Sequence, residues 1–135
     1  GFQTAIIGAD WGIVVTMPEI AAVRDADKII GRLQAEDKDI RLVVNRIRPQ
    51  MVKEGTMLDM EQIDEILSVP CIGQVPDDMK VVDSANRGVP VVEWEDSAAG
   101  QAYRDIVARV CGEDVPFRPF ETEGFLSRLK HVFGR

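Results

Sequence analysis

The sequence predicts an α/β fold: a partial doubly wound parallel sheet followed by an amphipathic helix at the carboxyl end. Short apolar runs alternate along the chain with segments in which apolar residues recur every three or four positions. The first pattern is typical of strands buried in a parallel sheet, and the second of helices that pack on such a sheet. With 45% hydrophobic and 29% charged residues in 135, the chain has the composition of a domain with its own core.

Two units of a strand followed by a helix are expected in the first half of the chain. Unbroken runs such as Ile13-Val14-Val15 indicate strands covered on both faces. Pro18 suits the first position of the helix that follows. The expected elements are, in order, the end of a helix at 1–9, a strand at 11–16, a helix at 18–35, a strand at 40–47, a loop at 48–56 and a helix around 60–67.

The second half predicts one more strand and two helices. Asp96 or Ser97 supplies an amino-terminal cap for the last of these helices, and Gly112 ends it. The expected elements are a strand at 69–75 ended by Pro76, a short helix at 79–87 ended by Gly88, an extended piece at 89–92 and a helix at 97–111. The core positions expected in that last helix are Ala99, Ala102, Tyr103, Ile106, Val107 and Val110.

The pattern changes after Gly112, where two prolines occur and apolar periodicity stops. Residues 113–123 are therefore interpreted as a linker between a domain at 1–112 and a separate helix at 124–135.

Composition excludes several classes of protein. A net charge of −7 argues against nucleic acid as the main partner, because phosphate binding needs a basic face. No apolar stretch approaches the roughly 20 residues of a membrane-spanning helix, and the amino terminus lacks the pattern of a secretory signal. We expect a cytoplasmic protein. Cys71 and Cys111 fit neither a disulfide framework nor a zinc site and are interpreted as small buried residues.

The last twelve residues, 124–135, differ from the rest of the chain. They contain three basic residues and no acid, which leaves residues 1–123 with a net charge of −10. Their apolar residues follow one helical stripe and their basic residues lie off it, as in helices that rest on a membrane surface. A terminal helix docked on its own domain is the alternative. The residues expected at the membrane are Phe125, Leu126, Arg128, Leu129, Lys130, Val132 and Phe133.

Free-energy estimates predict that one such tail binds a membrane weakly. Three basic residues contribute about 3 kcal/mol at an anionic surface, and five partly buried apolar side chains add about 1.5 kcal/mol or less each. Ordering about ten residues costs roughly 1 kcal/mol each, which offsets most of that gain. Two tails on a dimer act as linked ligands, which raises the apparent affinity for the membrane. We therefore expect the dimer to stay on the membrane longer than the monomer does.

Polar residues follow two of the predicted strands. Asn45 and Arg46 lie at the end of the strand at 40–47, and Pro76, Asp77 and Asp78 follow the next strand. In an open parallel sheet, ligands bind beyond the carboxyl ends of the strands, so both segments should face one crevice. The amide of Asn45 can pair with an adenine edge and Arg46 can stack on a base. Ordinary turn chemistry explains the same residues equally well.

Other groups point to no chemistry. No lysine follows a glycine, so these residues contain no phosphate-binding loop and are not expected to hydrolyse nucleotide alone. His131 is interpreted as a headgroup-level side chain rather than a catalyst. Paired acids occur at Asp25 with Asp27 and at Asp77 with Asp78, but a solvated helix face and a turn account for them. We assign no catalytic residue and no metal ligand.

Five motifs together carry a family resemblance. They are Met17-Pro-Glu-Ile-Ala-Ala-Val-Arg-Asp-Ala-Asp-Lys-Ile-Ile-Gly, Val43-Val-Asn-Arg-Ile-Arg-Pro, Ile72-Gly-Gln-Val-Pro-Asp-Asp, Ala85-Asn-Arg-Gly-Val-Pro and Gly124-Phe-Leu-Ser-Arg-Leu. In order and spacing the chain resembles the MinD/ParA family of deviant Walker ATPases, and within it the members that place the division septum. The resemblance covers the carboxy-terminal half of that P-loop NTPase-like fold, without the half that holds the phosphate loop, switch regions and magnesium-side aspartate.

The resemblance implies a function for the intact protein. It implies a homodimer formed around ATP and magnesium, peripheral on the inner face of the cell membrane, which recruits MinC and is released when MinE stimulates ATP hydrolysis. Asn45 and Arg46 match the adenine-contacting position, and Pro76, Asp77 and Asp78 the loop beside the base. Residues matching a partner-contact helix are Arg24, Asp25 and Asp27.

Two alternatives stay open. The chain could be a non-catalytic membrane-binding or partner-binding module that is complete as it stands. It could instead be a soluble chromosome-partitioning relative, although the acidic body argues against that interpretation. The coding sequence upstream of Gly1 separates the first alternative from the ATPase hypothesis, because an in-frame phosphate loop there would exclude a stand-alone module.

Overall fold

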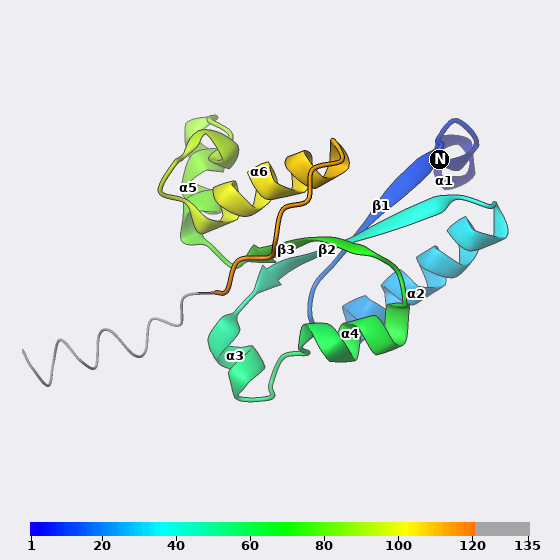
Figure 1. The fold of residues 1–135 in the computed structure, drawn as a ribbon, viewed down its shortest axis with the longest axis horizontal. Helices are drawn as coiled ribbons and strands as arrows, with labels where there is room; N and C mark the ends of the chain where they lie inside the picture. The colour runs from blue at the N-terminus through cyan, green and yellow to red at the C-terminus, as the bar shows by residue number, and fades with distance from the viewer. Residues whose placement is uncertain (121–135) are drawn as a thin grey trace, which may run out of the picture.

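The computed structural model describes residues 1–120, and its centre is a parallel sheet of three strands in the order β1-β2-β3 (Figure 1). The strands are β1 (Trp11–Thr16), β2 (Asp39–Ile47) and β3 (Cys71–Pro76). The helices are α1 (Phe2–Ile7), α2 (Ile20–Ala35), α3 (Pro49–Lys53), α4 (Met60–Leu67), α5 (Met79–Arg87), the 3-10 turn η1 (Val91–Glu93) and α6 (Ala98–Val110). The predicted helix at 124–135 lies outside the described residues.

Helices lie on both faces of the sheet. Helices α2 and α4 pack on one face, and α6 lies on the other with α5 beside it (Figure 1). Successive residues of β2 therefore enter different cores: Leu42 and Val44 pack with α2 and α4, whereas Val43 packs with Ile106 of α6. The predicted α/β architecture with a parallel sheet is confirmed.

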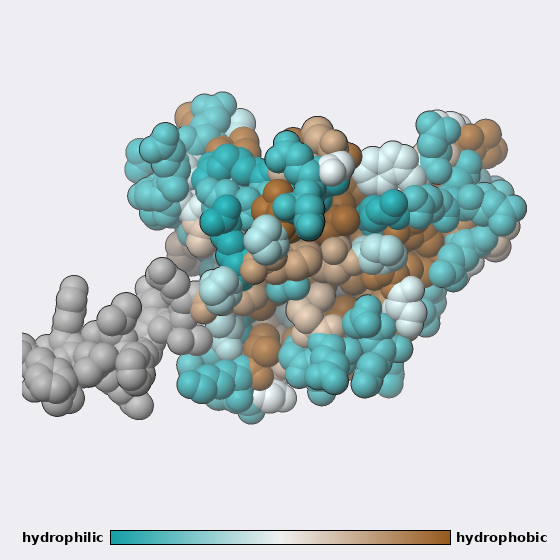
Figure 2. Space-filling model, viewed as in Figure 1, coloured by the Kyte–Doolittle hydropathy of each residue, from teal (hydrophilic) through white to brown (hydrophobic). Residues whose placement is uncertain are grey.

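The prediction that the first strand is covered on both faces is wrong. Val14 is buried against α2, but Ile13 and Val15 are 43% and 60% exposed. The cause is the position of β1, which pairs only with β2 among the described residues, while α6 contacts β3. Figure 2 shows hydrophobic surface in the band between α6 and the α2–α4 layer.

The start of α2 differs from its prediction. Pro18 is fully buried and precedes the helix, and Glu19 is the N-cap, with no capping hydrogen bond from its side chain. The carbonyl of Pro18 accepts the N–H of Leu58, which ties this turn to the segment before α4. Pro18 is therefore a buried residue of the turn before α2, joined to Leu58 by its carbonyl, and not the first residue of the helix.

Other expected elements also need correction. The expected loop at 48–56 contains α3, which has Pro49 in its first turn, and the expected extended piece at 89–92 is instead η1. In α6, the expected core positions Val107 and Val110 are 59% and 44% exposed, whereas Ala99 and Ile106 of the same helix are buried in the core with Val43 and Val75.

Neither cysteine is a buried core residue. Cys71 is half-buried and Cys111 is exposed, which corrects the expectation for both. Burial raises the pKa of the Cys71 thiol above its ordinary value, so it stays protonated at neutral pH.

Several predicted helix ends are confirmed. Ser97 caps α6 by accepting the N–H of Gly100 on its hydroxyl oxygen at 3.0 Å. Gly88 ends α5 with a positive φ of 66°, a conformation that costs glycine little. No helix within residues 1–120 combines the length and hydropathy needed to traverse a bilayer.

Candidate nucleotide-binding site

The two predicted loops lie side by side at the carboxyl edge of the sheet. Ile47 of β2 is in register with Pro76 of β3, and the N–H of Asp77 donates to the carbonyl of Ile47 at 2.8 Å. The strand pairing therefore brings Asn45 and Arg46 next to the loop that begins at Pro76. This is the edge at which ligands bind in open parallel sheets.

The backbone at Asn45 and Arg46 departs from regular strand geometry. The pairing of β2 with β3 shifts register between Val44 and Ile47, and Arg46 has a φ of 57°, in the left-handed region. A residue with a side chain is uncommon there, and such strained positions cluster at functional sites. Asn45 Oδ1 accepts the N–H of Arg46 at 2.9 Å, which stabilises the turn and fixes the orientation of the amide.

This hydrogen bond changes the expected role of Asn45. One lone pair of Oδ1 is already used within the chain, so bidentate pairing with a base must use the second lone pair together with the Nδ2 donors. Asn45 is half-buried, and the side chain of its neighbour Arg46 is 58% exposed. A planar ligand can therefore approach the guanidinium from solvent.

Asp77 holds two arginines of the neighbouring strand end. Its carboxylate accepts Arg48 Nε at 2.6 Å, and Arg46 Nε lies 3.6 Å from its other oxygen. The Asp77 side chain is 29% exposed and both arginines are more than half exposed, so the pairs contribute little to stability. The guanidinium of Arg46 thus lies beside the Asp77 carboxylate, which is hydrogen-bonded to Arg48. Sequence reasoning missed Arg48, although it follows the same strand end as Arg46.

Asp78 points away from that surface and is used inside the fold. Its Oδ1 accepts the N–H of Lys80 at 2.9 Å, and its Oδ2 accepts Ser97 Oγ at 2.6 Å and the N–H of Ala99 at 3.2 Å. Partial burial raises the pKa of Asp78, but the hydrogen bonds from Ser97, Lys80 and Ala99 outweigh it and hold the pKa below its ordinary value. The carboxylate is thus already satisfied by the protein.

The predicted base-contacting residues form an open surface rather than a pocket. A cavity of about 290 Å³ lies under α3, and one of about 470 Å³ lies between α1, β1 and α2. Asn45, Arg46, Asp77 and Asp78 line neither cavity. The arrangement offers amide donors, a guanidinium face and a fixed carboxylate, which suits reading a flat, polar base edge but not bond cleavage.

The three predicted partner-contact residues are exposed on α2. Arg24, Asp25 and Asp27 all face solvent, and Asp25 pairs with Lys28 at 3.0 Å. In residues 1–120 no group of three or more histidine, cysteine or acidic side chains is placed to hold a metal ion.

Comparison with known proteins identifies the relatives of this fold. No protein-family model matches the chain. It is 44% identical to the septum site-determining protein MinD of Bacillus subtilis over 138 aligned positions, which cover 99% of this chain and 52% of the relative. It is 48% identical to MinD of Synechocystis over 89% of this chain and 46% of the relative. The chain is a MinD homologue.

Solved MinD structures match its fold. The MinC:MinD cell division protein complex of Aquifex aeolicus superposes with a TM-score of 0.86 at 43% identity, covering 90% of this chain and 50% of that one. MinD of Pyrococcus horikoshii, solved with Mg-ADP, matches in fold with a TM-score of 0.70 at 23% identity. The chain spans about half the length of the MinD relatives it matches.

Proposed function

We propose that this chain is the base-recognising and membrane-contacting part of a MinD-like ATPase that places the division septum. Asn45, Arg46 and the loop at Pro76 and Asp77 contact the adenine of ATP, and Asp78 holds that loop in place. The observation that carries this proposal is the juxtaposition of those two loops at the carboxyl edge of a MinD-like sheet. The triphosphate and its magnesium ion are held by residues outside these 135, so the chain by itself is not expected to hydrolyse ATP.

The residues present fit an adenine ring. Asn45 Nδ2 supplies donors, and a second lone pair of its Oδ1 remains as an acceptor beside them. Arg46 offers a planar cation that lies beside Asp77 and is exposed to solvent. Asp78 acts in this site through position alone, because its hydrogen bonds keep the loop in place between α5 and α6.

Nuclear magnetic resonance of the 135-residue chain tests the base site. Titration with ATP should shift the side-chain amide signals of Asn45 and the backbone amide of Arg46, and CTP at the same concentration should shift them less. We expect an affinity near the millimolar level, about −4 kcal/mol, because only the base is contacted. Asn45→Ala should abolish the shift at Arg46, whereas Gln50→Ala on the exposed side of α3 should preserve it. Shifts confined to other regions would refute the assignment.

Membrane binding is the second part of the proposal. Residues 124–135 carry the amphipathic pattern. They have a net positive charge, whereas residues 1–123 are strongly acidic. On this basis the protein is peripheral on the inner face of the cell membrane and binds it firmly only as an ATP-dependent homodimer. Co-sedimentation with vesicles that contain anionic lipid should be lost in Phe125→Glu/Phe133→Glu. Equal sedimentation of both forms would show that the tail is not the anchor.

The third part concerns protein partners. The exposed side of α2 carries a charged surface formed by Arg24, Asp25 and Asp27. We propose that this surface contacts MinC-type and MinE-type partners, and that the MinE-type partner stimulates the hydrolysis that releases the intact ATPase from the membrane. The solved complex of a 43% identical homologue with MinC supports a MinC contact in the family. Asp25→Lys/Asp27→Lys should weaken the affinity for MinC in titration calorimetry, and Arg32→Ala at the other end of α2 should not.

A further inference from the structure

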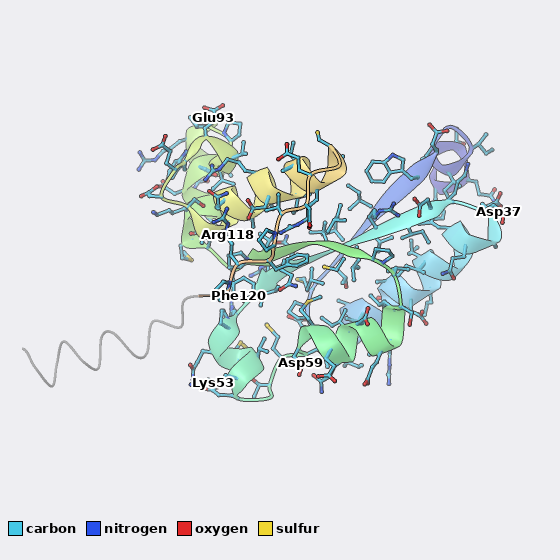
Figure 3. The ribbon with its side chains drawn as sticks, in the orientation of Figure 1. Asp37, Lys53, Asp59, Glu93, Arg118 and Phe120 are labelled. Carbon is cyan, nitrogen blue, oxygen red and sulfur yellow. The ribbon has the colours of Figure 1, made fainter. Side chains whose placement is uncertain are left out.

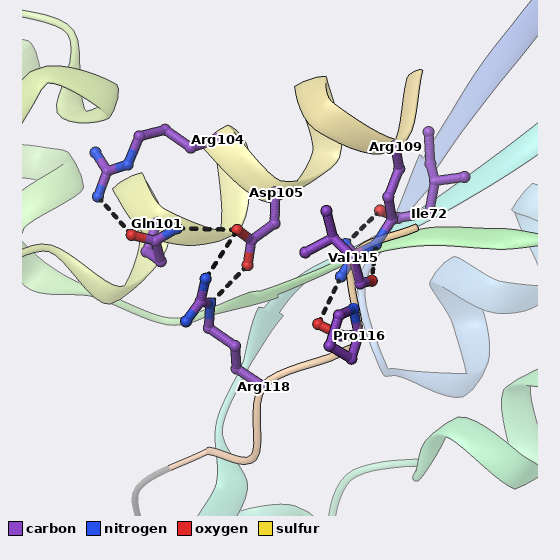
Figure 4. Close-up of polar contacts among 8 residues, drawn as sticks. All are labelled: Ile72, Gln101, Arg104, Asp105, Arg109, Val115, Pro116 and Arg118. Carbon is purple, nitrogen blue, oxygen red and sulfur yellow. Dashed lines mark hydrogen bonds and ion pairs between the residues drawn. The ribbon is translucent and has the colours of Figure 1, made fainter. Parts of the chain in front are cut away.

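The chain after α6 turns back along the domain and is held by Arg109. The guanidinium of this α6 residue donates to the carbonyls of Ile72 at 2.9 Å, Val115 at 2.8 Å and Pro116 at 3.2 Å (Figure 4). It also lies 4.0 Å from the centre of the Phe117 ring. One side chain thus ties β3, α6 and the following segment together.

A second arginine fastens the same segment further along. Arg118 Nε lies 2.8 Å from Asp105 Oδ2, and its terminal nitrogen donates to Oδ1 at 3.3 Å (Figure 4). The Asp105 side chain is only 10% exposed and also accepts Gln101 Nε2 at 2.9 Å. A bidentate pair with a mostly buried carboxylate fixes geometry better than a surface ion pair does.

The segment ends in an apolar pocket. Phe120 is half-buried and lines the cavity of about 290 Å³ under α3, where it packs against the core formed by α2, α4 and β2. Figure 3 shows Phe120 at the carboxyl edge of the sheet, near α3 and far from Asp37 at the other end. The apolar lining of this cavity includes Pro18, Ile47, Pro49, Val52, Leu58 and Met60. We call residues 115–120 the strap.

Chain length limits how far residue 124 can lie from this pocket. Four peptide units join Phe120 to residue 124, which span at most about 14 Å when extended. Without the strap, the thirteen units from Cys111 to residue 124 could span about 45 Å. A docked strap therefore restricts the start of the membrane-targeting segment to the neighbourhood of α3.

We propose that the strap sets the orientation of the domain on a lipid bilayer, with the corner formed by α3 and the start of α4 facing the membrane. This inference rests on the proposed membrane binding by residues 124–135. Charge does not decide the orientation, because the proposed corner carries Glu54, Asp59 and Glu61 against Lys53, so the short tether to Phe120 carries this proposal. The opposite end of the sheet is similarly negative, with four acids and two bases. Those residues are Asp10, Glu36, Lys38, Asp37, Asp39 and Arg41.

Lipid-borne quenching tests the orientation on the full 135-residue chain. A fluorescent label is placed at Glu54→Cys beside α3 or at Glu36→Cys at the far end, with Cys71→Ala and Cys111→Ser removing the native thiols. Both labelling positions are exposed. Vesicles of phosphatidylcholine and phosphatidylglycerol carry a nitroxide on a fraction of their headgroups. The Glu54 label should be quenched and the Glu36 label should not.

A released strap should abolish this difference without abolishing binding. In Arg118→Ala/Phe120→Ala we expect the vesicle-bound fraction to persist and the two labels to be quenched equally. Phe120→Leu refills the pocket and should keep the wild-type preference. Equal quenching in the wild type, or an unchanged preference in the released variant, would overturn the proposal.

Chymotrypsin in the absence of vesicles separates the strap from the membrane proposal. Cleavage after Phe117 should be about tenfold faster in Arg118→Ala/Phe120→Leu than in Phe120→Leu alone, since a charged hydrogen-bond pair is worth about 1.5 kcal/mol and opening of the strap controls cleavage. Equal rates would show that the pair does not dock the strap. Failure of the wild-type chain to sediment with vesicles would instead reject membrane binding, and the orientation claim with it, and would leave the cleavage result unaffected.

Discussion

The hydroxyl of Ser97 donates a 2.6 Å hydrogen bond to the Oδ2 of Asp78. Ser97 is the N-cap of α6 and Asp78 is the N-cap of α5, so one carboxylate serves the amino-terminal ends of two helices. The negative charge is favourable at both ends, where unpaired N–H groups concentrate. Asp78 therefore holds the loop that begins at Pro76 in place beside Asn45 and Arg46.

Removing the Asp78 carboxylate should destabilise the domain. Asp78→Ala loses a helix cap, worth about 1 kcal/mol, and leaves Ser97 Oγ and the N–H of Ala99 without their partner, which costs about 1 kcal/mol more. We expect the free energy of unfolding in urea to fall by about 2 kcal/mol in total. Asp83→Ala on the exposed side of α5 breaks only a surface pair with Arg87 and should cost under about 0.5 kcal/mol. Similar costs for the two variants would contradict the capping role.

Stability should fall in acid because the carboxyls of Asp105, which is buried, and Asp78, which is half-buried, have lowered pKa values. The bidentate hydrogen bonds from Arg118 lower the pKa of Asp105. Partial burial raises the pKa of Asp78, but its hydrogen bonds lower that pKa by more. A pKa lowered in the folded state gives stability that is present above the unfolded value, near 3.8, and is lost as pH falls through the folded value. Urea unfolding at pH 7, 4 and 3 should show this loss, with a smaller slope in Asp105→Asn. A slope equal to wild type would disprove the assignment.

Two glycines of different helices should respond oppositely to alanine. A Cβ on Gly100 of α6 would meet the backbone oxygens of Val91 and Trp94, the latter at 3.2 Å, and backbone cannot move aside easily. Gly100→Ala should therefore lower the free energy of unfolding by about 1 to 3 kcal/mol. Gly31→Ala in α2 meets open space and should raise it by about 0.5 to 1 kcal/mol through helix propensity. Thermal unfolding of both variants measures the contrast, and a loss in both would refute it.

The exposed apolar side of β1 should promote self-association of this chain. Val15 is 60% exposed and Ile13 is 43% exposed on a strand that pairs on one side only among the described residues. Val15→Lys should reduce light scattering at high concentration, because a charge on an edge strand opposes pairing between chains. The matched change Val107→Lys on exposed α6 should reduce it less. Equal effects would show that the β1 edge is not the point of contact.

Apolar periodicity was sufficient to predict the strands and most helices. The alternation of buried runs with amphipathic segments identified β2, α2, α4 and α6, and helix-capping residues set the ends at Ser97 and Gly88. The rule that ligands bind beyond strand carboxyl ends placed Asn45 and Arg46 beside Asp77, as the structure confirms by the pairing of Ile47 with Pro76.

Other features depended on tertiary contacts that a local pattern does not encode. An apolar run in the sequence does not show which strands a neighbouring helix covers. The sequence therefore did not predict that Ile13 of β1 is exposed, while α6 contacts β3. The positive φ of Arg46 occurs where β2 shifts register against β3. The side chain of Asp78 points into the fold because it accepts a hydrogen bond from Ser97, nineteen positions away. Residues 113–123 remain a predicted linker, yet Arg118 is held by Asp105 thirteen positions earlier.

Photoaffinity labelling with azido-ATP tests the central claim, that the carboxyl edge of this sheet contacts adenine. The chain is irradiated with the reagent, digested and mapped by mass spectrometry, with ATP or CTP as competitor. The account predicts labelling within residues 45–48 or 76–78 that excess ATP suppresses and CTP does not, and that Asn45→Ala strongly reduces. Labelling confined to other segments, or equal suppression by the two nucleotides, would contradict it.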